Sequence, residues 1–92
     1  MKIVINSCFG GFCLSDEAIL CLECEYSFEY DNRRTDPDLI NVVENLGELA
    51  SGPFSDLRVI EIPDDATDWE LNDYDGLEGI TYVLDGKLRH AG

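Results

Sequence analysis

The sequence predicts an α+β fold, in which a small sheet of three to five strands carries two helices on one face. Three observations predict it. β-Branched runs lie near both ends of the chain, two segments with helical spacing lie between them, and tight-turn pairs separate the last strands. The expected element order is β-α-(β)-α-β-β-β. With 92 residues and 45% apolar side chains, the chain is expected to form a single domain, residues 1–92.

The first half of the chain is expected to hold one strand and two helices. Residues 2–5 are a β-branched run that predicts the strand, and Ser15 is a favourable N-cap for the first helix. Aromatic and polar residues alternate over 25–30, which fits a strand, although the first helix can also continue into this segment. The second helix is expected to begin at Asp36-Pro37 and to end before Ser51-Gly52-Pro53.

The second half is expected to hold three strands. Residues 57–62 form the first of them, and alternation around Trp69 predicts the next, which ends at a turn at Tyr74-Asp75-Gly76. Residues 80–84 form the returning strand, which Asp85-Gly86 closes as a tight turn. The residues from Lys87 onward are expected to be a loose tail. The strands at 2–5 and 57–62 are expected to be parallel neighbours, because the segment between them is long enough for a helical crossover.

The charge is strongly negative. The chain contains twenty Asp and Glu residues and six Lys and Arg residues, which gives a formal net charge of −14. A protein that binds nucleic acid through the phosphate backbone needs clustered basic residues, so direct nucleic-acid binding is excluded. Docking to an anionic membrane is disfavoured for the same reason. Such a chain is attracted to basic surfaces, and those are mostly the nucleic-acid channels of other proteins.

The segment 61–78 is the most acidic part of the chain and contains no basic residue. Ordinary solubility needs a net charge of only about 2–8, so we consider two interpretations, a solvated face and a partner-binding surface that imitates phosphates. The candidate partner-binding residues are Glu61, Asp64, Asp65, Asp68, Glu70, Asp73, Asp75 and Glu78. Asp36, Asp38 and Glu44 are further candidates outside this segment.

The four cysteines lie at Cys8, Cys13, Cys21 and Cys24. Residues 1–6 show no secretory signal pattern, so we expect a cytosolic protein with reduced thiols and no bound metal. Their spacing leaves two alternatives open, a four-thiolate zinc site and disulfides.

Two further patterns bear on small ligands and catalysis. Gly10 and Gly11 follow a strand and precede the helix start at Ser15, where backbone N–H groups can bind a small anion such as a nucleotide phosphate. The alternative is a tight turn that lets Phe9 and Phe12 pack on opposite sides. His90 is the only histidine, near the end of the chain, so nucleophilic catalysis is not expected and no cofactor is implied.

Several segments resemble a family of small phage and prophage proteins of unknown function. They are KIVIN at residues 2–6, CFGGF at 8–12, LSDEA at 14–18, RTDPDL at 34–39 and IEIPDD at 60–65. The chain departs from the family pattern at Cys13, where the family has glycine, in the short segment 24–32, and in 84–92, which lacks an aromatic-basic ending. The resemblance implies a phage or mobile-element gene expressed in a bacterial cytosol, and it brings no activity with it.

Charge and resemblance together give the leading hypothesis, a non-enzymatic acidic inhibitor of the anti-CRISPR type. Its partner is expected to be a host nucleic-acid-binding complex with a basic surface. Two alternatives stay open: a small-ligand or nucleotide-binding module built on Gly10, Gly11 and Ser15, and a zinc-stabilised interaction domain.

Overall fold

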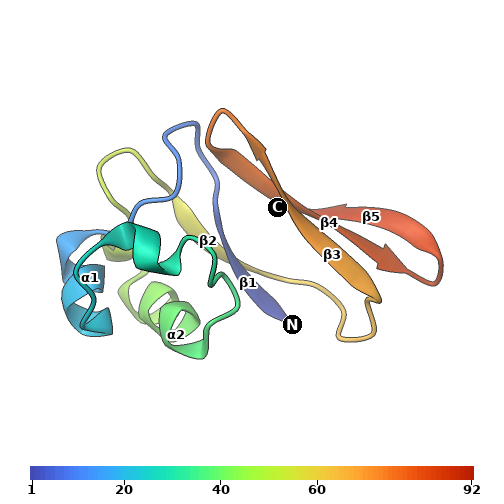
Figure 1. The fold of residues 1–92 in the computed structure, drawn as a ribbon, viewed down its shortest axis with the longest axis horizontal. Coiled ribbons are helices and arrows are strands. Elements are labelled where there is room, and N and C mark those ends of the chain that lie inside the picture. The colour runs from blue at the N-terminus through green and yellow to red at the C-terminus, as the bar shows by residue number, and fades with distance from the viewer.

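The computed structural model describes residues 1–92 and has the predicted α+β class, with its elements arranged in three layers (Figure 1). The helices lie against one face of a two-stranded sheet, and a three-stranded sheet lies against the other face. The elements are β1 (Lys2–Asn6), α1 (Asp16–Leu22), the 3-10 helix η1 (Ser27–Tyr30), α2 (Pro37–Leu46), the 3-10 helix η2 (Gly47–Ala50), β2 (Leu57–Glu61), β3 (Asp68–Tyr74), β4 (Leu77–Leu84) and β5 (Lys87–Ala91).

The two α-helices begin where the sequence predicts. The Ser15 hydroxyl accepts a hydrogen bond from the Ala18 N–H, and the Asp36 carboxylate accepts the first free N–H groups of α2. The second helix ends earlier than predicted, because Gly47 takes a positive φ of 57° and the chain continues as η2. No helix has the length and apolarity that a membrane span requires, since α2 is the longest and has ten residues.

The expected parallel pairing of the first strand with 57–62 is wrong, because β1 and β2 are antiparallel. Lys2 lies opposite Glu61 and Asn6 lies opposite Leu57. The chain returns after η2 to the end of β1 rather than to its start, and the Ser7 N–H donates to the Asp56 carbonyl at 2.8 Å. β2 therefore starts beside the residue at which β1 ends.

The last three strands form a second antiparallel sheet in the order β3-β4-β5, whereas one sheet was expected. The residues from Lys87 onward are not a loose tail, since β5 pairs with β4 from Leu84↔Lys87 to Ile80↔Ala91. The turns at Asp75-Gly76 and Asp85-Gly86 are confirmed, and all four of these residues have positive φ, as tight hairpin turns require.

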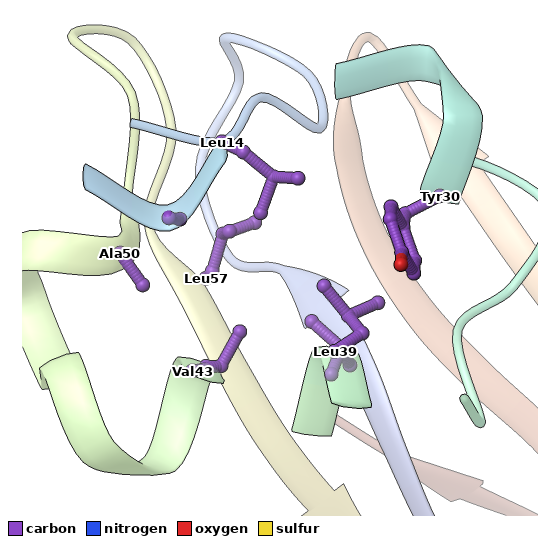
Figure 2. Packing of buried hydrophobic residues seen from close by; sticks show 8 residues of the cluster. Leu14, Tyr30, Leu39, Val43, Ala50 and Leu57 are labelled. Carbon is purple, nitrogen blue, oxygen red and sulfur yellow. The ribbon is translucent and has the colours of Figure 1, made fainter. Parts of the chain in front are cut away.

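Two apolar clusters lie on opposite faces of β1. Val4 and Leu57 pack with Leu14, Leu39, Val43 and Ala50 of the helical layer, and Tyr30 closes this cluster (Figure 2). The segment 25–30 is thus not a strand, because η1 turns Tyr30 inward. On the other face of β1, Ile3 and Ile5 pack against Ile62 and Ile80. Successive strand residues point to opposite faces, so β1 is the central element of the molecule.

Candidate partner-binding surface

Seven of the eight acidic residues predicted in 61–78 are exposed, and the eighth is not. The side chain of Glu78 is only 4% exposed and forms an ion pair with Arg34, whose Nη1 lies 2.5 Å from Glu78 Oε1. The expectation that Glu78 belongs to a partner-binding surface is therefore wrong. The Glu78 carboxylate is instead the internal partner of Arg34, and loss of either side chain would leave the other charge buried and unpaired.

The guanidinium of Arg34 uses all five of its N–H groups inside the protein. Nε donates to the Asp31 carbonyl at 2.9 Å, and the two terminal nitrogens donate to the Val4 carbonyl, to Asp31 Oδ1 and to both oxygens of Glu78. The Phe12 ring lies beneath it at 3.9 Å. Burial lowers the pKa of Arg34, but the hydrogen bonds with Glu78 and Asp31 raise it more, so the net direction is upward. Arg34 has no N–H left for an external anion.

Asn6 completes the contact between the two sheets, and we call Asn6, Arg34 and Glu78 together the junction. Its backbone N–H donates to Glu78 Oε1 at 2.7 Å, and its fully buried side chain donates to the carbonyls of Cys8 and Gly76 and accepts from the Asp56 N–H. One side chain thus ties together three chain segments that lie far apart in the sequence. Sequence analysis missed this role, because only the break in the β-branched run marks Asn6.

The outward face of the β3-β4-β5 sheet carries two of the predicted acids. Asp68 and Glu70 lie opposite Val83 and Thr81, and alternation along β3 directs them away from Leu71, which packs against the inner apolar cluster. Asp68 and Glu70 line a shallow pocket of about 140 Å³, which also contacts Leu88. No helix covers this face (Figure 1), so these carboxylates are open to a partner.

The other exposed acids of the segment have varied roles. Asp64 contacts the amino group of Met1 at 2.6 Å, and this hydrogen bond and its charge lower the pKa of Asp64. Asp73 accepts the Gly76 N–H at 2.7 Å and so stabilises the β3-β4 turn. Glu61 lies opposite Lys2 in the β1-β2 sheet. Asp65 and Asp75 are exposed and form no ion pair.

The three additional candidates lie on the helical side, away from the outer sheet face. Asp36 caps α2, Asp38 lies in its first turn, and Glu44 pairs with Lys2 at 2.9 Å. The hydrogen bond that Lys2 Nζ donates to Glu44, and secondly the negative charge of Glu44, raise the pKa of Lys2. The structure therefore does not bring these residues together with Asp68 and Glu70.

Most of the negative charge remains uncompensated. The ion pairs involve Asp31, Glu44, Asp56, Asp64 and Glu78, which are five of the twenty acidic residues. Fifteen carboxylates thus have no cationic partner within the chain. Unpaired surface charge of one sign creates a long-range field that attracts partners of the opposite sign.

The glycine pair of the small-ligand hypothesis is used for packing between loops. A Cβ at Gly10 would overlap the Phe54 carbonyl oxygen, and a Cβ at Gly76 would lie 2.5 Å from the Gly11 nitrogen. The hydroxyl of Ser15 caps α1 and donates to the Leu49 carbonyl at 2.5 Å. These contacts favour the tight-turn interpretation of Gly10 and Gly11, but Phe9 and Phe12 do not both pack, since Phe9 is exposed.

The cysteines and the histidine do not form a chemical site. All four cysteines are free thiols, and no three side chains among the His, Cys, Asp and Glu residues are placed to hold a metal ion. The Cys8 thiol contacts Asn6 and the Phe54 carbonyl, whereas His90 contacts Thr81 on the outer sheet face. No hydrogen bond joins His90 to a cysteine thiol, so the predicted thiols and the histidine are not brought together.

Comparison of the chain with protein-family models, with curated proteins and with solved structures finds no match.

Proposed function

We propose that this protein is a non-enzymatic inhibitor that binds the basic, nucleic-acid-binding surface of a bacterial defence complex. The observation that carries the proposal is the set of fifteen carboxylates without a cationic partner, on a chain of net charge −14. A surface that holds phosphate through Lys and Arg side chains binds other closely spaced anions by the same attraction. Such binding blocks the nucleic acid by competition and needs no reaction.

The contact is proposed to centre on the outer face of the β3-β4-β5 sheet. Asp68 and Glu70 project from the same face of a strand, so their attachment points lie about 6.8 Å apart along it. Asp65 lies in the exposed turn that precedes β3 and adds a third unpaired carboxylate close to them in the sequence. Because the backbone is hydrogen-bonded in a sheet, these carboxylates are held at fixed spacing before the partner arrives, which reduces the entropy lost on binding.

The nature of the partner follows from the resemblance to phage and prophage proteins. A phage protein of this kind meets the nucleic-acid-binding complexes of bacterial defence in the host cytosol, and a CRISPR effector is the first class to test. This step is by analogy with other small acidic phage proteins, so the experiment includes restriction systems as well.

The proposal is tested by capture and competition. Tagged protein is incubated with lysates of bacteria that carry CRISPR or restriction systems, and bound complexes are eluted along a salt gradient. We expect a nucleic-acid-handling complex that elutes at moderate salt and that loses its nucleic acid when this protein is added. Association is expected to be fast and salt-sensitive, because opposite charges steer the encounter.

Two matched variants locate the contact. D65N/D68N/E70Q removes three exposed charges on and beside β3, and E25Q/E29Q/E48Q removes three exposed charges on the helical side. We expect the first variant to slow association with the captured complex by about tenfold and the second to change it much less. An equal effect of the two variants contradicts a contact at this face. If the folded protein captures no partner with a basic surface, the proposed function is wrong, and the negative charge only keeps the surface solvated.

A further inference from the structure

Three loops meet at one end of the molecule, and each of them displays an exposed aromatic side chain. They are the segment after β1, the segment before β2, and the β3-β4 turn, which lie together at the upper edge of the view in Figure 1. We call residues 8–11, 53–55 and 74–76 the loop tip. Its exposed aromatic residues are Phe9, Phe54 and Tyr74, with exposed fractions of 64%, 77% and 73%.

The loop tip is fixed by buried contacts beneath it. The Asn6 side chain bonds to the Cys8 and Gly76 carbonyls at 2.8 and 2.7 Å and to the Asp56 N–H at 2.8 Å, so it reaches all three loops. The Cys8 thiol lies 3.1 Å from the Phe54 carbonyl oxygen, a second link between two of the loops. Backbone held in this way loses little conformational entropy when its side chains bind a partner.

The exposure of these aromatic residues is not a general property of their loops. Phe12 follows Phe9 in the same loop, yet it packs against the helical core and beneath Arg34. The fold can therefore bury an aromatic side chain in this region, but Phe9, Phe54 and Tyr74 remain in solvent. Exposed aromatic side chains on a rigid backbone are typical of the residues that contribute most to protein–protein binding.

The charges around the loop tip restrict the kind of partner. The three loops contain no Lys or Arg, and the turn that carries Tyr74 also carries Asp73 and Asp75. Asp56, at the edge of the tip, is paired with Arg58 at 3.1 Å. Aromatic faces attract cations, and unpaired carboxylates beside them strengthen that preference. A second copy of this chain, also at −14, is repelled.

We infer that the loop tip is the apolar anchor of the partner interface and docks on a protein surface in which apolar side chains are interleaved with arginines. This inference rests on the proposed function, because it assigns the residues that hold the basic partner after charge has attracted it. The outer face of β3-β4-β5 governs the rate of encounter, and Phe9, Phe54 and Tyr74 govern the lifetime of the complex.

Two model peptides of equal length and charge separate the two contributions. One alternates arginine with leucine and the other alternates arginine with serine. We expect the Arg-Leu peptide to bind the wild-type protein about tenfold more tightly by calorimetry, and to shift the amide NMR signals of the loop tip. The variant F9S/F54S/Y74S is expected to bind both peptides with the same affinity. Because all three side chains are exposed, this variant should keep the wild-type Tm.

The matched control is L20S/F28S/L49S, which removes three comparably exposed apolar side chains outside both the loop tip and the outer sheet face; Leu20, like Phe54, is 77% exposed. This control is expected to retain the tenfold preference. Equal affinity of the two peptides for the wild-type protein overturns the anchor, and so does a preference that survives in F9S/F54S/Y74S. Co-sedimentation of wild-type protein, but not of that variant, with phosphatidylcholine vesicles also overturns it, since the tip is then a membrane contact.

The same experiment distinguishes failure of the anchor from failure of the proposed function. Salt-sensitive binding of the Arg-Ser peptide at the outer sheet face, without any preference for leucine, overturns the anchor and leaves charge-based binding intact. If the wild-type protein binds the Arg-Leu peptide but not the Arg-Ser peptide, the result supports the anchor and argues against recognition by carboxylates alone.

Discussion

Glu70 and Glu78 belong to paired strands of one sheet, and their environments are opposite. Glu78 faces inward, is buried, and satisfies Arg34 and the Asn6 N–H. Glu70 faces outward, lines an open pocket and has no cationic partner. One position stabilises the contact between the two sheets, and the other is available to a partner. The position of a carboxylate relative to the sheet therefore decides its role, although residue type and charge are identical.

The junction and the outer sheet face also contribute differently to stability and to binding. A buried ion pair adds little net stability when complete, because desolvation offsets its attraction, but removal of one partner leaves a buried charge uncompensated. An exposed carboxylate can be removed at almost no cost in stability. Substitutions at the junction should therefore affect folding, and substitutions on the outer face should affect binding.

The largest effect is expected from Arg34→Met, which breaks the junction. Glu78 and Asp31 lose their cationic partner, and the Glu78 carboxylate remains buried without a counter-charge. We expect the free energy of unfolding to fall by about 3–5 kcal/mol, which for a small domain is a large part of the total. Urea denaturation followed by tryptophan fluorescence measures it.

The matched control is Arg58→Met. Arg58 forms an ion pair with Asp56 at 3.1 Å, but its side chain is 65% exposed and that of Asp56 is 43% exposed, against 4% for both Arg34 and Glu78. The expected loss is at most about 1 kcal/mol, because exposed pairs are screened by water. Equal losses for the two variants would show that the Arg34–Glu78 pair does not hold the two sheets together.

A smaller but still substantial loss is expected from Asn6→Ala. The change removes the side chain that serves the Cys8 and Gly76 carbonyls and the Asp56 N–H. Unsatisfied buried polar groups are costly, so we expect a loss of about 2–3 kcal/mol. Amide hydrogen exchange should show faster opening of the three loops before the rest of the fold. Asn45→Ala, on the exposed side of α2, is the control and should leave stability within about 0.5 kcal/mol.

Local sequence patterns predicted the elements whose signals lie within a few residues. Asp36 and Pro37 marked the start of α2, and Asp75-Gly76 and Asp85-Gly86 marked two hairpin turns. The direction of β2 relative to β1 depends on where the chain returns after two helices, which no local pattern contains. The strand β5 was missed because its residues are mostly exposed and gain their order from pairing with β4.

The candidate site shows the same limit. The excess of negative charge and the acidic segment are visible in the sequence, but the distinct role of Glu78 is not, because its partner Arg34 is remote in the chain. The role of Asn6 was not predicted for the same reason, because its side chain is hydrogen-bonded to residues 8, 56 and 76, two of which are remote in the chain. Exposure of Phe9 and burial of Phe12 also depend on tertiary packing, although both flank the glycine pair.

A near-neutral effect on folding is expected from D65N/D68N/E70Q, which sharpens the contrast with the junction. These side chains are exposed and form no ion pair, so the free energy of unfolding should change by less than about 0.5 kcal/mol, or rise slightly as self-repulsion falls. Salt at about 1 M should stabilise the wild-type protein more than this variant, because it screens the charges that the variant lacks. Urea denaturation at two salt concentrations checks both statements, and a loss above about 2 kcal/mol would assign these residues to the fold.

The smallest effect tests a similar contrast between two residues of one type, the half-buried Cys24 and the exposed Cys21. Burial, and secondly the charge of Glu29, raise the pKa of Cys24, so its thiolate fraction at a given pH is reduced, whereas Cys21 is exposed. Because the thiolate is the reactive form, iodoacetamide should label Cys24 several-fold more slowly than Cys21, as peptide mass spectrometry can measure. Glu29→Gln should speed labelling of Cys24 and leave Cys21 unchanged. Equal rates at the two thiols would contradict the partial burial of Cys24, and fewer than four reactive thiols in denaturant would contradict the free state of the cysteines.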